Sequence, residues 1–314
     1  MASVAVAAVA VAGEAWETEY ERALEQAQQR GGYVLVDFTG SDWCRWCKVL
    51  KEKVLDSAEF EDYVRRQGLT LLELDYPRSV EKLSAERLAK IEEIRRRYGV
   101  ESFPTVMLLD AQGRPFARLK GSAVDAQEYV GRIEERLKAK REYDAAVAAA
   151  GGVQGVERAL ALSAALEMLP EDCRLGQSEV VAEIVRCDVE NKTDYKRQVE
   201  EERLLHVQRQ RLEAFMDKYR GQVQRERVEA ARDEMLAMLK EEDWLPLMRL
   251  MMNKYVSDCY AMTQNLPKTL EYLEAAIASA PGTKEAAQLK PWAENLRKHQ
   301  NDFSKPGGIP KEDH

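Results

Sequence analysis

The sequence predicts an α/β domain followed by an all-α helical domain. The chain has 314 residues, which is long enough for two domains. Up to about residue 145, short apolar runs typical of strands alternate with segments of helical periodicity, whereas no strand pattern occurs from about residue 153 onward. Between these parts, residues 145–152 are rich in alanine and glycine, so we place the boundary there. The expected parts are a leader at 1–13, an α/β domain at 14–145, a helical domain at 153–300 and a disordered tail at 301–314.

The elements of the first domain follow from apolar periodicity and from turn residues. Residues 14–29 place Trp16, Tyr20, Leu24 and Ala27 on one stripe, as in an amphipathic helix. We expect strands at Val34–Val36, Leu69–Asp75, Val106–Leu109 and Pro115–Leu119, with the last two joined by a hairpin turn at Asp110–Gly113. We expect helices from the cysteine pair at 44 and 47 to about Tyr63, from the N-cap Ser84 to Tyr98, and from Val124 to about Tyr143.

The composition is that of a globular protein with a highly charged surface. Hydrophobic residues make up 45% of the chain and charged residues 32%, and the formal net charge is -8. General nucleic-acid binding needs a basic face, so this charge argues against a nucleic-acid partner.

Residues 2–12 form an apolar run of alanine and valine that ends just before Gly13-Glu14-Ala15. This is the composition of a signal-peptide core with a small-residue cleavage site after Ala12 or Ala15. The positive residues that usually precede such a core are missing, and the run is too short to span a bilayer. We expect an exported, periplasmic protein without a stable membrane span. The alternative is a cytoplasmic protein with a disordered or helical leader.

A Cys-x-x-Cys pair lies between the first strand and the helix that follows it. The turn Thr39–Asp42 leads through Trp43 into Cys44-Arg45-Trp46-Cys47. Cys44 would lie at the positive end of the helix dipole, which favours its thiolate, the nucleophile in disulfide exchange. The neighbouring Arg45 should stabilise this thiolate further. Cys47, one turn into the helix, is placed to resolve the mixed disulfide with a partner.

Two other interpretations of the cysteine pair are weaker. A zinc site needs four ligands, but the sequence has no second Cys-x-x-Cys, and His206, His299 and His314 are distant and scattered. A purely structural disulfide is disfavoured because so short a loop stabilises little. We therefore predict a redox-active pair, no metal site and no cofactor other than the pair itself.

The order Val36-Asp37-Phe38, a tight turn, and Trp43-Cys-x-x-Cys-Lys48 resembles the active-site segment of the thioredoxin superfamily. Phe103-Pro104-Thr105, which precedes a strand, is similar to the family's cis-proline segment, and an X-Pro bond is where a cis peptide costs least. The resemblance covers about residues 14–140. It implies a central mixed four-stranded sheet with helices on both faces.

The resemblance also implies roles for the residues near the cysteines. Trp43 and Trp46 would shield the pair and contact the client protein. Phe103, Pro104 and Thr105 would orient the client strand.

Two features depart from the family pattern. The dipeptide between the cysteines is Arg-Trp, neither the Gly-Pro of thioredoxin nor the Pro-His of a strong oxidant. Asp37 matches the buried aspartate that the family uses in proton transfer, but one extra residue separates it from Cys44. A polar residue that ends a strand is the alternative interpretation of Asp37.

From residue 153 onward, helical runs are separated by breakers such as Pro170, Pro246 and Pro267. Degenerate tetratricopeptide-like helix pairs and an ordinary helical bundle explain this pattern about equally well. In an exported protein, Cys173 and Cys187 allow a structural disulfide, which would leave Cys259 unpaired.

The sequence therefore predicts a thiol-disulfide oxidoreductase that exchanges disulfides with client proteins through Cys44 and Cys47. Its expected partners are client proteins with thiols or disulfides and an upstream redox partner. The alternative is a helical scaffold or chaperone-like binding protein, in which the thioredoxin-like domain is a redox or isomerase module.

Overall fold

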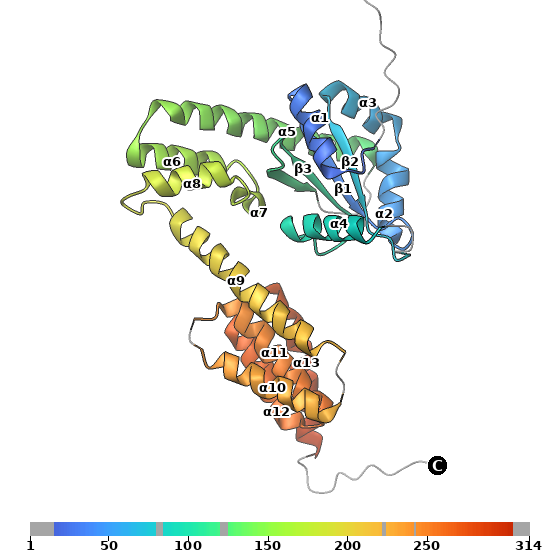
Figure 1. Ribbon diagram of the computed structural model, residues 1–314, viewed down its shortest axis with the longest axis vertical. Coiled ribbons are helices and arrows are strands. Elements are labelled where there is room, and N and C mark those ends of the chain that lie inside the picture. The colour runs from blue at the N-terminus through green and yellow to red at the C-terminus, as the bar shows by residue number, and fades with distance from the viewer. Residues whose placement is uncertain (1–15, 80–83, 120–124, 222–223, 242, 304–314) are drawn as a thin grey trace, which may run out of the picture. The chain divides into compact units, whose positions relative to one another are not determined.

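The computed structural model describes residues 16–79, 84–119, 125–221, 224–241 and 243–303 and divides into two compact units (Figure 1). The first unit is Met1–Lys196 and the second is Arg197–His314. Each unit has hydrophobic clusters of its own. The predicted leader at 1–13 lies outside the described residues.

The first unit is built on a four-stranded mixed sheet with the order β2-β1-β3-β4, as the resemblance implied. The strands are β1 (Val34–Thr39), β2 (Thr70–Asp75), β3 (Thr105–Leu109) and β4 (Pro115–Leu119). β1 pairs in parallel with β2 and antiparallel with β3, and β3 pairs antiparallel with β4. All six side chains of β1 are buried, as expected for a central strand that is covered on both faces.

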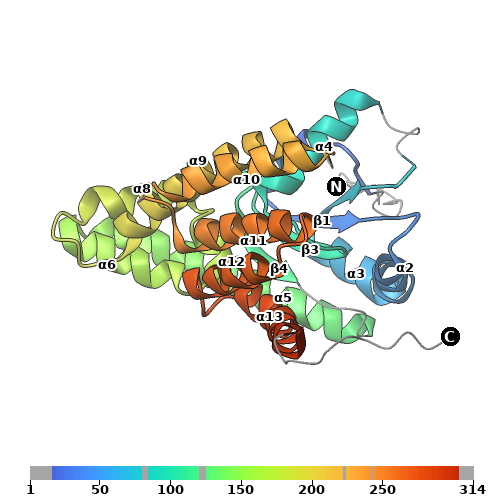
Figure 2. The same cartoon turned by 90° about the horizontal axis from the view of Figure 1, so that it is seen from below.

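Helices cover both faces of this sheet, and Figure 2 shows α4 on one side of it and α3 and α5 on the other. The helices are α1 (Tyr20–Arg30), α2 (Arg45–Leu50), a π-helical turn (Lys51–Leu55), α3 (Ala58–Gln67), α4 (Ala85–Arg97) and α5 (Ala126–Ala149). α1 and α4 share a cluster with Val34, Val36 and Phe38, whereas α2, α3 and α5 share the opposite cluster with Leu35. Side chains two residues apart in a strand point to the same face, which explains this division.

Two predicted helices of the first unit differ from the observed ones. Residues 16–19 are not helical, because Glu17 instead extends the edge of β2, where its N–H donates to the Leu71 carbonyl at 2.9 Å. The helix after the cysteines does not continue unbroken to Tyr63. It ends at Leu55, and Ser57 caps the new helix α3 by accepting the N–H of Phe60. Ser84 caps α4 as predicted, and its side chain accepts the N–H of Arg87.

Residues 145–152 do not separate the two units. α5 continues through this stretch to Ala149, because alanine is the best helix former, and a short 3₁₀ turn (Ala150–Gly152) follows. The next helices, α6 (Gly155–Leu166), α7 (Glu171–Arg174) and α8 (Ser178–Cys187), belong to the first unit and share its hydrophobic cluster. The observed division lies after Lys196, about fifty residues beyond the expected one.

These additional helices dock on the edge strand β4. The buried Gln177 donates through Nε2 to the Pro115 carbonyl at 2.7 Å, and Arg114 forms an ion pair with Glu179 at 2.8 Å. An uncovered edge strand invites pairing with another chain, and α7 and α8 protect this edge. The first unit is therefore a thioredoxin-like sheet with its own helical extension.

The second unit is entirely helical within the described residues. It contains most of α9 (Tyr195–Tyr219), followed by α10 (Arg225–Leu239), α11 (Pro246–Met262), α12 (Leu266–Ser279) and α13 (Lys284–Phe303). Pro246 and Pro267 lie in the first turns of α11 and α12, where a missing N–H costs least. α11 contributes to both clusters of this unit, so it is the central helix. Tetratricopeptide-like repeats stay a prediction.

Two expectations outside the main elements also differ. Cys173 and Cys187 form no disulfide, and both are buried free thiols, as is Cys259. The predicted disordered tail begins too early, because residues 301–303 belong to α13; residues 304–314 lie outside the described residues. Within the described part of the chain, no helix is both long and apolar enough to cross a membrane.

Candidate active site

The cysteine pair lies at the carboxyl end of the central strand β1. The chain turns at Gly40, whose carbonyl accepts the N–H of Cys44 at 2.8 Å. Gly40 is required by close packing, since a Cβ there would lie 2.5 Å from Cε2 of Trp43. This tight turn brings the cysteines directly onto the start of helix α2.

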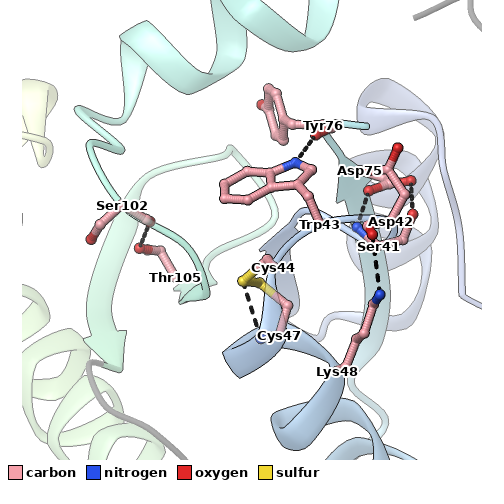
Figure 3. The surroundings of a disulfide bond; sticks show 10 residues. All are labelled: Ser41, Asp42, Trp43, Cys44, Cys47, Lys48, Asp75, Tyr76, Ser102 and Thr105. Carbon is pink, nitrogen blue, oxygen red and sulfur yellow. Dashed lines mark hydrogen bonds between the residues drawn. A yellow bond between two sulfur atoms is a disulfide. The ribbon is translucent and has the colours of Figure 1, made fainter. Parts of the chain in front are cut away.

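Cys44 and Cys47 form a disulfide, with 5.3 Å between their Cα atoms (Figure 3). Cys44 is the N-cap of α2, and its Sγ accepts the backbone N–H of Cys47 at 3.1 Å. The same N–H would stabilise the Cys44 thiolate after reduction, together with the helix dipole. Both cysteines are largely buried, with 5% of Cys44 and 3% of Cys47 exposed.

Hydrogen bonds hold the loop before the disulfide in place. Both carboxylate oxygens of Asp75, at the end of β2, accept hydrogen bonds from Ser41, one from its N–H at 2.8 Å and one from its hydroxyl at 2.6 Å. The exposed carboxylate of Asp42 accepts the backbone N–H groups of Arg78 and Ser79, and these bonds lower its pKa. The loop is therefore tied to the segment that follows the neighbouring strand.

The two tryptophans next to the cysteines are held differently. Trp43 donates from Nε1 to the Tyr76 carbonyl at 2.8 Å, and its ring meets the Phe103 ring edge-on, with 5.6 Å between centroids (Figure 3). Trp46 is 54% exposed and contacts the Arg45 guanidinium, whereas Trp43 is 36% exposed. Both rings are thus available beside the disulfide, and Trp43 has the more fixed position.

The Phe103–Pro104 peptide bond is cis, which is the conformation expected from the sequence. Thr105 follows as the first residue of β3 and pairs with Phe38, so this segment lies at the same end of the sheet as the disulfide. The Thr105 hydroxyl donates to the Ser102 carbonyl at 2.7 Å, and Figure 3 shows both residues beside the disulfide. The structure therefore brings the predicted segment 103–105 and the cysteine pair together.

Asp37 is the one buried acid of β1, with 3% of the residue exposed. No described residue forms a hydrogen bond with its Oδ1 atom. Burial, followed by the nearby charge of Glu73, raises the pKa of Asp37 from 3.8 to about 7, although Lys51 opposes this rise. The Lys51 ammonium is held by Glu73 at 2.9 Å. Asp37 is therefore a carboxyl group that takes up and releases a proton near neutral pH.

Asp37 also faces the helix that carries the cysteines. It points to the same sheet face as Leu35, which packs in one cluster with Leu50 of α2 and Tyr129 of α5. Its charge contributes to the raised pKa of Tyr129, which follows mainly from burial. β1 ends at Thr39, so residues 40–43 form the turn that leads from the strand of Asp37 to Cys44.

Comparison with known proteins agrees with this geometry. Residues 20–136 match the thioredoxin-like domain family. The disulfide bond reductase DsbH of Chlamydia pneumoniae is 32% identical over 130 residues, which cover 41% of this chain and 76% of that protein. The chain belongs to the thioredoxin-like family. With its Cys44–Cys47 pair, it is a thioredoxin-like disulfide oxidoreductase.

Two further comparisons match part of this thioredoxin-like protein. The thioredoxin-related protein DsbJ of Chlamydia pneumoniae is 27% identical over 107 residues, which cover 33% of this chain and 29% of that protein. A solved structure of a DsbH oxidoreductase is 30% identical in sequence, with a TM-score of 0.38. The match covers 44% of this chain and 95% of the chain in that structure.

Several residues around the thioredoxin-like site were not found from the sequence. These are Asp75 and Tyr76, which hold the loop and Trp43, and the Lys51–Glu73 pair near Asp37. One signal was present for these two residues. Asp75 ends β2 and Tyr76 follows it, and because β2 runs parallel to β1, the carboxyl ends of both strands meet at the same edge. Among the described residues, no group of three or more His, Cys, Asp or Glu is placed to hold a metal ion.

Proposed function

We propose that this protein exchanges disulfides with client proteins through Cys44 and Cys47. One observation carries the proposal: the two cysteines are joined at the start of a helix, and the Cys44 sulfur already accepts a backbone N–H. A thiolate at this position is stabilised, so Cys44 is the nucleophile and Cys47 is the resolving cysteine. The disulfide itself is the only redox group that this chemistry needs.

In the reducing direction, the Cys44 thiolate attacks one sulfur of the client disulfide. A mixed disulfide forms and the first client thiolate leaves. Cys47 then loses its proton and attacks the Cys44 sulfur, which releases the second client thiolate and closes the Cys44–Cys47 disulfide. Two electrons pass to the client, whose thiolates take up two protons. An upstream dithiol must then reduce the pair again.

We assign the proton transfer of the second step to Asp37. A group is most effective in proton transfer when its pKa lies near the working pH, and burial brings the pKa of Asp37 to about 7. Its position on the sheet face below α2 supports the same role. Lys51, held by Glu73, is a positioning residue that limits how far the pKa rises.

The client chain is oriented by residues around the disulfide. Phe103, Pro104 and Thr105 lie at the same sheet end as the cysteines and offer backbone groups beside them. Trp43 and Trp46 offer exposed aromatic surface on the segment that carries the cysteines. Together they provide an apolar contact and a strand-like contact for the residues that flank a client cysteine.

The name of the relative supports the reducing direction, because DsbH of Chlamydia pneumoniae is called a disulfide bond reductase. The apolar run at residues 2–12 supports export into a compartment where client disulfides form. An exported reductase needs a supply of electrons, so we include an upstream redox partner in the proposal.

Equilibration of the protein with glutathione or dithiothreitol buffers tests this function and its direction. A reduction potential near that of thioredoxin, about -270 mV, supports a reductase, whereas a value near about -120 mV makes the protein an oxidant. Cys47→Ser should trap a mixed disulfide with a client, and Cys44→Ser should trap none. Cys173→Ser, which changes a buried free thiol elsewhere, is the matched control. The absence of reversible exchange at Cys44 and Cys47 would refute the proposal.

A further inference from the structure

Two guanidinium groups lie against the two tryptophans that flank the disulfide. The Cζ atom of Arg78 is 5.2 Å from the centroid of the Trp43 ring, and that of Arg45 is 5.8 Å from the Trp46 ring. All four side chains are exposed. We call Trp43, Arg45, Trp46 and Arg78 the Trp–Arg rim.

Neither guanidinium of the Trp–Arg rim forms an ion pair with a residue that the structure describes. The nearby carboxylates bind other groups. Asp42 accepts backbone N–H groups at positions 78 and 79, and Asp75 accepts both of its hydrogen bonds from Ser41. Lys48 adds a third exposed cation, whose Nζ donates to the Asp42 carbonyl at 3.1 Å. Among the described residues, no carboxylate therefore occupies the N–H donors of either guanidinium, and a bound partner can use them.

The charge of the Trp–Arg rim contrasts with that of the whole protein. The chain has a formal net charge of -8, which repels acidic partners in general. At the disulfide, however, a partner meets two arginines and one lysine beside the exposed carboxylate of Asp42, which already accepts two backbone N–H groups. A guanidinium that stacks on an aromatic ring keeps its edge open, and this edge binds a carboxylate with two parallel hydrogen bonds.

We propose that the Trp–Arg rim selects client segments in which acidic side chains flank the reacting cysteine. This inference rests on the proposed function, because it names the client class of the same disulfide. The client backbone and apolar groups contact the two tryptophan rings, while its carboxylates bind Arg45 and Arg78. Contacts of this kind act while the mixed disulfide forms, so they favour the exchange of acidic clients over neutral and basic ones.

The expected preference is modest and depends on salt. One exposed ion pair changes a rate by about threefold, so the two arginines together give up to about tenfold. At about 0.1 M salt the screening length is about 10 Å, whereas at about 1 M it is about 3 Å, which should remove most of the preference.

The test uses the full chain, reduced beforehand with dithiothreitol that is then removed, and peptides with one internal disulfide. Three peptides differ only in the residues beside their cysteines, which are glutamate, glutamine or lysine. The measured quantity is the rate of peptide reduction, followed by chromatography after acid quenching. We expect the rates to rank glutamate, then glutamine, then lysine, and Arg45→Gln and Arg78→Gln each to lower the glutamate-to-glutamine ratio by about threefold.

This ratio cancels effects of Arg45 on the Cys44 thiolate, because both peptides meet the same nucleophile. Arg66→Gln is the control, because Arg66 lies in the last turn of α3, far from the disulfide. α3 ends just before β2 begins, and the first residues of β2 pair with the start of β1, whereas the disulfide lies beyond the other end of β1. Equal rates for the three peptides, or an unchanged ratio in both variants, would overturn the inference while leaving the proposed function intact. A protein that reduces none of the peptides and no glutathione disulfide would refute the proposed function, and this inference with it.

Discussion

The buried carboxyl of Asp37 should make the first unit less stable as the pH rises. The pKa of Asp37 is raised from 3.8 to about 7 by burial, so between these values the folded state binds the proton more tightly than the unfolded state. The free energy of unfolding therefore decreases as the pH rises through this window, and the penalty is complete above the folded pKa. Each pKa unit corresponds to about 1.4 kcal/mol, which gives about 4 kcal/mol for the ionised carboxylate.

Asp37→Asn removes this charge but keeps the shape of the side chain. At about pH 8.5 the variant should be about 4 kcal/mol more stable than the parent, and at about pH 4.5 the difference should shrink to about 1 kcal/mol. For a unit of this size, the larger difference corresponds to a melting temperature about 10 °C higher. The same variant should slow the resolution of mixed disulfides, because the amide that replaces the Asp37 carboxylate cannot accept the proton of Cys47.

Calorimetry of the oxidised protein at both pH values measures the effect. Only the transition of the first unit should move, because Asp37 lies in that unit. Asp62→Asn, which changes an exposed acid of α3, is the matched control and should show no comparable pH-dependent gain. An equal stability difference at both pH values would show that Asp37 does not titrate in this window and would refute the reasoning.

Three further predictions follow from the packing of the first unit. Gly40→Ala places a Cβ against the Trp43 ring, and such overpacking lowers the free energy of unfolding by about 1–3 kcal/mol. We expect a lower melting temperature, altered tryptophan fluorescence and slower disulfide exchange. Lys140 is buried and pairs with Asp144 at 2.5 Å, so Lys140→Ala should lose about 2–4 kcal/mol in urea unfolding, whereas Lys140→Met should lose less than about 1 kcal/mol. Equal losses would contradict this account. A chain that ends after Lys196 should melt cooperatively and keep the disulfide exchange, whereas one that ends after residue 145 exposes the cluster covered by α6 and α8 and should aggregate.

The sequence alone was sufficient for the features that depend on neighbouring residues. The strands of the first unit, the cap at Ser84, the cis bond before Pro104 and the Cys-x-x-Cys pair at a helix start could all be predicted. The strands, the cap and the helix start are determined by interactions within a few residues along the chain, such as apolar alternation or a side chain that caps its own helix. The cis bond was expected from the resemblance of residues 103–105 to the thioredoxin superfamily.

The tertiary structure decided which distant residues meet. Asp75 and Tyr76 hold the active-site loop only because β2 lies parallel to β1, and the same pairing places Glu73 opposite Asp37. The helices of residues 155–187 belong to the first unit because their apolar faces cover the sheet edge and its helices, although composition placed a boundary before them. Periodicity shows that a helix has an apolar face, but it does not show which surface that face covers. That choice depends on the free energy of burying one particular surface rather than another, and it is made only when the chain is folded.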